Sequence, residues 1–124
     1  MINLKIQNFS IANNLPFILI AGPCVLESEI KSLLIAEEIH KICNELGINY
    51  IFKASFDKAN RSSIQSQRGV TLDDGLKIFE KIKKNFKCPI ITDVHTEDQC
   101  NILKENSIID ILQIPAFLCR QTDL

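Results

Sequence analysis

The stretch INYIFKASFDKANRSS, residues 48–63, joins an apolar run to a cluster of cationic, amide and hydroxyl side chains. Its first part, INYIF, is typical of a strand buried on both faces of a parallel sheet. The part KASFDKANRSS holds two lysines, an arginine, an asparagine and three serines. These are the groups that bind phosphate and carboxylate. The stretch therefore predicts a buried strand that ends at an anion-binding site.

A buried strand followed by an amphipathic helix recurs along the chain. We expect strands at 17–21 (FILIA), 48–54 (INYIFKA), 89–94 (PIITDV) and 109–115 (IDILQIP), and helices at 28–46, 72–86 and 97–105. Ser28, Thr71 and Thr96 are predicted N-caps, and Gly47 is predicted to end the first helix. The strand at 17–21 is expected to be buried on both faces. The alternation predicts βαβ units around a parallel sheet with right-handed crossovers.

Two closures of such a sheet fit the pattern: an open doubly wound sheet of flavodoxin type, or part of a barrel of eight strand–helix units. The length of 124 residues favours the open sheet, because a complete barrel needs about 250 residues. The polar residues at the strand ends favour the barrel. A receiver domain of the open type needs paired acids after its first strand, where this sequence has Gly-Pro-Cys. Residues 1–15 alternate weakly and predict a small hairpin ahead of the sheet.

The composition argues against several classes of partner. Fourteen Lys and Arg against fifteen Asp and Glu give a net charge of −1, so no overall field attracts nucleic acid or an anionic membrane. No window approaches the roughly 18 apolar residues of a membrane span, and the N-terminus lacks a signal-peptide pattern. The five cysteines are odd in number and form no C-x-x-C pair. We expect a reduced, cytoplasmic, single-domain protein that binds neither nucleic acid nor membrane.

Chemically capable side chains follow every predicted strand. They are Cys24, Lys53 with Ser55, Asp93 with His95, and Gln113. Because the carboxyl ends of parallel strands lie at one edge of a sheet, we expect these groups to converge. A cation such as Lys53 at a buried strand is costly unless an anion or acid meets it. Cys24 fits a packing residue, a metal ligand or a reactive thiol, and His95 fits a ligand, a base or a hydrogen-bonding partner.

Four stretches, in this order, resemble the 3-deoxy-D-manno-octulosonate 8-phosphate synthase family. They are AGPCVLES (21–28), FKASFDKANRSSI (52–64), ITDVHT (91–96) and LQIPAFLCRQTDL (112–124). The resemblance implies an enzyme that condenses phosphoenolpyruvate with D-arabinose 5-phosphate and water, releasing phosphate, on the way to lipopolysaccharide. It implies a partial (β/α)8 barrel in which 1–124 is the N-terminal half: the hairpin at 1–15, then four strand–helix units at 16–124, ending at the start of the fourth helix. The 3-deoxy-heptulosonate 7-phosphate synthases and a non-enzymatic barrel remnant are the alternatives.

The resemblance also implies residue roles by match. Phosphoenolpyruvate would contact Lys53, Ser55, Lys58, Gln113 and the backbone at Ala116. Arabinose 5-phosphate would contact Asn60, Arg61 and Ser62. The implied catalytic residues are Lys53, Lys58 and Asn60, with Asp93 in support. The outer loop departs from the family pattern at Gln65, Gln67, Val70 and Thr71, which weakens the match around the sugar phosphate.

Cysteine at position 24 is similar to the metal-dependent members of the family, which use zinc, iron or manganese. The resemblance places the remaining metal ligands outside these 124 residues, and it implies a homotetramer for the full-length family. One thiol cannot hold a catalytic metal, because such sites use about three protein ligands. We therefore expect the chain alone to have little or no turnover.

Overall fold

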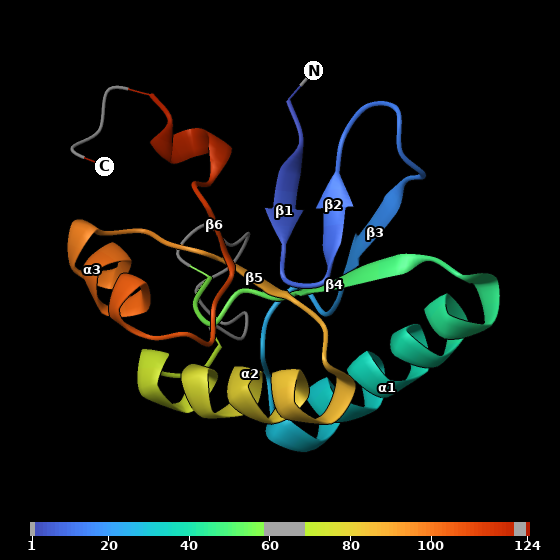
Figure 1. Ribbon diagram of the computed structural model, residues 1–124. Coiled ribbons are helices and arrows are strands. Elements are labelled where there is room, and N and C mark those ends of the chain that lie inside the picture. The colour runs from blue at the N-terminus through green and yellow to red at the C-terminus, as the bar shows by residue number, and fades with distance from the viewer. Residues whose placement is uncertain (1, 59–68, 121–123) are drawn as a thin grey trace.

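The computed structural model describes residues 2–58, 69–120 and 124. An antiparallel hairpin of β1 (Leu4–Ile6) and β2 (Phe9–Ile11) comes first, within the predicted range. A four-stranded parallel sheet follows, with β3 (Ile18–Ala21), β4 (Asn49–Lys53), β5 (Ile90–Asp93) and β6 (Ile111–Gln113) side by side in chain order. The connecting helices α1 (Glu29–Leu46), α2 (Leu72–Phe86) and α3 (Glu97–Glu105) cover one face of this sheet (Figure 1).

The strand order decides between the two predicted closures. A doubly wound sheet reverses its strand order at a switch point, whereas β3-β4-β5-β6 runs without reversal. This is the arrangement of four successive units of a (β/α)8 barrel, preceded by a hairpin, and it confirms the predicted fold class. A short 3₁₀ helix, Ala116–Leu118, follows β6.

The helix boundaries follow from local capping chemistry. The hydroxyl oxygens of Ser28, Thr71 and Thr96 each accept a hydrogen bond from the backbone N–H three residues later, at 3.2–3.3 Å. This geometry satisfies one of the unpaired donors of a first helical turn. Gly47 ends α1 in the left-handed conformation with φ 67°, which glycine adopts without a steric penalty. All four predicted caps are confirmed.

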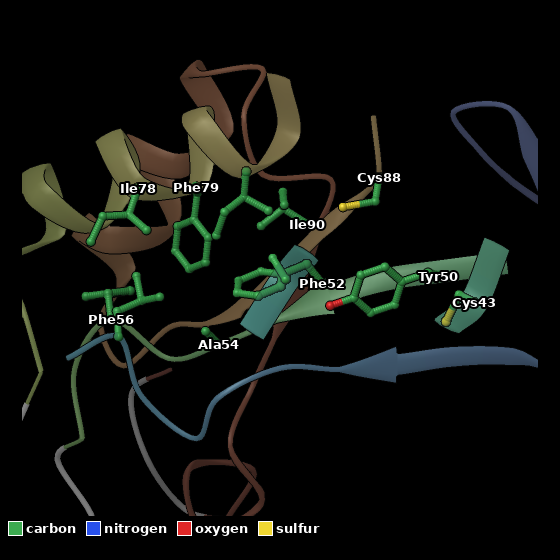
Figure 2. Packing of buried hydrophobic residues seen from close by; sticks show 12 residues of the cluster. Cys43, Tyr50, Phe52, Ala54, Phe56, Ile78, Phe79, Cys88 and Ile90 are labelled. Carbon is green, nitrogen blue, oxygen red and sulfur yellow. The ribbon is translucent and has the colours of Figure 1, made fainter. Parts of the chain in front are cut away.

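The core lies between the sheet and the helices. Phe52 of β4 and Phe79 of α2 are wholly buried, and their rings meet edge to face with centroids 6.2 Å apart. Figure 2 shows them at the centre of a cluster that also includes Tyr50, Phe56 and Ile90. Such aromatic pairs contribute about 0.5–1.5 kcal/mol beyond the area they bury. This packing fixes β4 and β5, the strands that carry Lys53 and Asp93.

The prediction that 17–21 is buried on both faces is wrong. Phe17 is 70% exposed and Ile20 is 44% exposed. The physical reason is position, since β3 has a neighbour on one side only, whereas β4 and β5 lie between two strands. The strand at the other edge of the sheet, β6, also has one neighbour only. It is shorter than predicted, and its Leu112 is 40% exposed. Among the described residues, no helix combines the length and hydrophobicity required to cross a membrane.

Candidate functional site

A cavity of about 190 Å³ lies at the carboxyl ends of β4, β5 and β6. Its lining comprises Lys53, Ser55, Lys58, Asp93, His95, Gln113, Pro115, Ala116 and Phe117. The sheet register explains this convergence, because Lys53 pairs with Ile91 and Asp93 pairs with Gln113. The structure thus brings together the described residues predicted to contact phosphoenolpyruvate, and it places Asp93, predicted as a supporting residue, in the same lining. Asn60, Arg61 and Ser62 lie outside the described residues.

Ser55 is held at the cavity by its backbone. Its N–H donates to the carbonyl of Cys24 at 3.3 Å, and its carbonyl accepts from the N–H of Leu26 at 2.8 Å. The residue is wholly buried, and its hydroxyl oxygen has no hydrogen-bond partner among the described residues. A fixed and desolvated hydroxyl of this kind is ready to bind a ligand without reorganisation.

Asp93 and His95 form a pair at the end of β5. The His95 Nε2 atom lies 3.0 Å from Asp93 Oδ2, and both side chains are about nine-tenths buried. The backbone N–H of His95 donates to Gln99 Oε1 at 2.7 Å, which anchors the histidine to α3. Within the described part of the chain, Asp93 Oδ1 and His95 Nδ1 are buried without partners. The pair therefore presents one fixed acceptor and one unsatisfied ring nitrogen.

His95 has no role among the residues assigned by the family resemblance. The signal that finds it is the two-residue period of an extended chain, which puts residues i and i+2 on the same side. Asp93 and His95 are separated by two, so a site at Asp93 predicts His95 beside it.

Gln113 closes the cavity from β6. Its backbone carbonyl accepts from the Val94 N–H at 3.1 Å, and its Oε1 is buried without a partner in the described residues. Rotation of the amide by half a turn exchanges oxygen and nitrogen, so this position can offer an N–H donor to an anion. Unpaired buried polar groups each cost about 1–3 kcal/mol. Among the described residues, five buried side chains have an unpaired polar atom, and four of these five line this one cavity.

Cys24 is exposed and does not line this cavity, although its backbone carbonyl accepts a hydrogen bond from the cavity residue Ser55. In the described ranges, no group of three or more His, Cys, Asp or Glu side chains is arranged to hold a metal ion. The described residues therefore do not fit a complete metal centre. The assignment of Cys24 as one metal ligand stays a prediction.

Two other cysteines belong to the core. Cys43 and Cys88 flank Tyr50 in the buried cluster (Figure 2). Burial raises the pKa of the Cys43 thiol and raises the pKa of Cys88 to about 11. A thiol that stays protonated at neutral pH is a poor nucleophile, so these cysteines act in packing.

All 124 residues match the family described as DAHP synthetase I family. The chain belongs to this family. Three relatives named 2-dehydro-3-deoxyphosphooctonate aldolase match it over 121 residues, with 53% identity in Rickettsia canadensis (strain McKiel), 54% in Rickettsia felis (strain ATCC VR-1525 / URRWXCal2) and 53% in Rickettsia prowazekii (strain Madrid E). The match confirms the family resemblance seen in the motifs. It covers 98% of this chain and 43% of each relative, so the chain spans less than half the length of these relatives.

Proposed function

We propose that this chain supplies the phosphoenolpyruvate-binding part of a synthase that condenses phosphoenolpyruvate, D-arabinose 5-phosphate and water. The products are 3-deoxy-D-manno-octulosonate 8-phosphate and phosphate, in lipopolysaccharide precursor biosynthesis. Family membership and the names of the relatives support the reaction class. The observation that carries the proposal is the cavity in which two lysines meet four polar side chains with unsatisfied buried atoms.

Phosphoenolpyruvate binds, in this proposal, through charge and fixed donors. The ammonium groups of Lys53 and Lys58 neutralise its phosphate and carboxylate. Ser55 Oγ and the Gln113 amide donate hydrogen bonds, and the backbone at Ala116 borders the ligand. Hydrogen bonds to charged groups contribute about 1.5–3 kcal/mol each. Asp93 supports the cations, and its Oδ1 accepts a hydrogen bond from a lysine, a hydroxyl or water.

The reaction joins two anions that repel each other. The methylene carbon of phosphoenolpyruvate attacks the sugar aldehyde, water adds to the adjacent carbon, and the tetrahedral intermediate loses phosphate. Lysines that neutralise the phosphates convert this unfavourable encounter into a positioned one. We propose Arg61 and Ser62 for the sugar phosphate and Asn60 nearer the reacting carbon, supported by the sequence match.

The cellular setting and assembly belong to the same proposal. We place the reaction in the cytoplasm, where the five free cysteines stay reduced. Cys24 would bind a divalent metal, zinc, iron or manganese, only together with ligands outside the described residues. A homotetramer is the assembly that the family resemblance implies.

A second candidate is the 3-deoxy-heptulosonate 7-phosphate synthase reaction, which the description of the family favours. The two reactions share phosphoenolpyruvate and differ in the sugar phosphate. Phosphate release with arabinose 5-phosphate, compared with erythrose 4-phosphate, separates them in any assembly that turns over. For the chain alone we expect little or no release, and measurable turnover by the purified 124 residues would contradict that expectation.

Binding of phosphoenolpyruvate to the chain tests the site directly. We expect Lys53→Met to weaken the affinity at least tenfold in isothermal titration calorimetry, because it removes a charge and keeps the aliphatic stem. The matched control is Lys84→Met on the exposed face of α2, expected to stay within twofold of the parent. Equal affinities for all three proteins would refute the proposed role of the cavity.

A further inference from the structure

Asp110 directly precedes β6, at the opposite end of this strand from Gln113. Its backbone N–H donates to the Ile90 carbonyl at 3.0 Å, and its Oδ2 accepts a hydrogen bond from the Ile90 N–H at 2.8 Å. A carboxylate oxygen thus takes the place of a backbone carbonyl at the start of the β5–β6 ladder. The main chain and the side chain of Asp110 are therefore both bound to Ile90.

The Asp110 carboxylate is also held by two other elements. Lys83 of α2 contacts both carboxylate oxygens at 3.0 Å. Gln7, in the turn between β1 and β2, donates from Nε2 to Oδ1 at 2.9 Å. The Asp110 side chain is 16% exposed, and hydrogen bonds to a charged group are roughly twice as strong as neutral ones. The carboxylate is therefore fixed from α2, from the hairpin and from β5.

The alignment of β6 with β5 decides where the Gln113 side chain lies. Strand β6 pairs with β5 through three residues, and in the described structure it has a strand on one side only. A slip of one residue turns every side chain of a strand to the opposite face of its sheet. Gln113, which lines the cavity beside Asp93, would then point away from it. A contact that fixes the register of β6 thus also fixes a side chain of the candidate site.

We propose that Asp110 is a positioning residue for the candidate site. By accepting a hydrogen bond from the Ile90 N–H, it fixes the alignment of β6 with β5 and thereby holds the Gln113 amide in the cavity. Asp110 does not itself line the cavity, and about 10 Å of extended chain separates it from Gln113. Its influence on phosphoenolpyruvate therefore passes through the strand. This inference rests on the proposed function, which assigns the Gln113 amide to that ligand.

A simpler role for Asp110 is that of counter-ion to Lys83. Lys83 also donates to the carbonyls of Ser107 and Ile108 at 2.8 and 2.9 Å, so the ion pair joins α2 to the segment before β6. The two roles have different requirements. An ion pair needs a negative charge, and the flexible lysine stem can follow a carboxylate that moves. The ladder contact needs an oxygen acceptor at one position, because a hydrogen bond weakens steeply with distance and angle, and it needs no charge.

Two substitutions of Asp110 meet one requirement each. Asp110→Asn keeps the side-chain length and an oxygen acceptor but removes the charge, whereas Asp110→Glu keeps the charge and is longer by a methylene group. We expect Asp110→Asn to bind phosphoenolpyruvate within threefold of the parent in titration calorimetry, and Asp110→Glu to bind at least tenfold more weakly. Lys83→Met is the matched control. It removes the ion pair, keeps the bond between Asp110 and Ile90, and should also stay within threefold.

Amide hydrogen exchange measured by NMR reports the alignment without the ligand. The Val94 N–H donates to the Gln113 carbonyl at 3.1 Å, and the Phe52 N–H, which bonds to the chain at the start of β5, is the internal reference. The ratio of the Val94 rate to the Phe52 rate should rise at least tenfold in Asp110→Glu. It should stay within threefold of the parent in Asp110→Asn and Lys83→Met. A general loss of stability raises both rates together and leaves their ratio unchanged.

The outcomes separate this inference from the proposed function. If the parent does not bind phosphoenolpyruvate, the proposed function fails, and the exchange ratios still decide whether Asp110 sets the alignment. Tenfold weaker binding by Asp110→Asn, tighter binding by Asp110→Glu than by Asp110→Asn, or an unchanged exchange ratio in Asp110→Glu would each overturn the inference. If circular dichroism shows that Asp110→Glu does not fold, Asp110→Ala replaces it, because it also lacks an acceptor at the required position and should show the same tenfold changes.

Discussion

Replacing Gly22 with alanine is expected to disturb the candidate site without altering any of its side chains. Gly22 directly follows β3, and a Cβ atom built on it lies 1.9 Å from the carbonyl oxygen of Lys53 and 2.9 Å from the carbonyl carbon. Real Cβ atoms keep at least 3.0 Å from such neighbours. The two backbone segments must therefore move apart by roughly 1 Å, since no rotamer change relieves a clash with main chain.

The expected losses of stability and of affinity depend on which residues this displacement moves. Overpacking a tight contact costs about 1–3 kcal/mol, and a clash with backbone on the neighbouring strand should fall at the upper end. Lys53 and Ser55 both line the cavity, and Ser55 is tied to the same segment through its hydrogen bond to Cys24. Loss of one charged hydrogen bond of about 2 kcal/mol lowers affinity about 30-fold. Gly22→Ala should thus reduce both the free energy of unfolding and the affinity for phosphoenolpyruvate.

Urea unfolding followed by circular dichroism and titration calorimetry with phosphoenolpyruvate measure the two effects. Gly47→Ala is the control, because its Cβ meets no atom within 4 Å but its φ of +67° is strained for alanine. This control should lose about 1 kcal/mol of stability and bind phosphoenolpyruvate normally. A Gly22→Ala protein with the parent's urea midpoint and affinity would refute the close-approach argument.

Two further predictions concern stability away from the cavity. Lys83 donates to two backbone carbonyls and pairs with Asp110 at 3.0 Å in a largely buried setting. Lys83→Met should therefore lower the free energy of unfolding by about 2–3 kcal/mol. An unchanged urea midpoint would contradict this prediction. The pKa of Cys88 is raised by burial from 9.0 to about 11, so between these values the folded state holds a proton that the unfolded state has lost. Stability should therefore be complete below pH 9 and fall by about 2–3 kcal/mol as the pH rises to 11, and Cys88→Ala should show a shallower decline if burial of this thiol is the cause.

The parts of the fold that depend on local chemistry could be predicted from the sequence. The caps at Ser28, Thr71 and Thr96 bond only to groups three residues away, so their residue types suffice. The exposure of Phe17 and Ile20 could not be predicted in this way, because it depends on what lies beside β3. A continuous apolar run indicates a strand that needs covering, and it does not reveal whether the covering is present.

The candidate site also has parts that could be predicted from the sequence and parts that could not. That Lys53 and Gln113 meet follows from parallel topology alone, which places all strand ends at one edge. Cys24 also follows a strand end and yet does not line the cavity. Its backbone carbonyl reaches the cavity residue Ser55 through a hydrogen bond, whereas the cysteine itself is exposed. The two-residue spacing puts Asp93 and His95 on the same side of the extended chain, but the 3.0 Å distance between His95 Nε2 and Asp93 Oδ2 depends on side-chain rotamers that the spacing does not specify.

Ser55 and Thr92 offer a test of whether the cavity trades stability for binding. Both are wholly buried, and neither hydroxyl has a partner among the described residues. Removing an unpaired buried hydroxyl should be stabilising, so Ser55→Ala and Thr92→Val should each raise the free energy of unfolding by about 1–2 kcal/mol. Only Ser55 lines the cavity, so only Ser55→Ala should weaken phosphoenolpyruvate binding in calorimetry. A more stable protein that binds its ligand less well is what a hydroxyl reserved for a ligand predicts, whereas a destabilised Ser55→Ala that binds normally would assign this serine to packing alone.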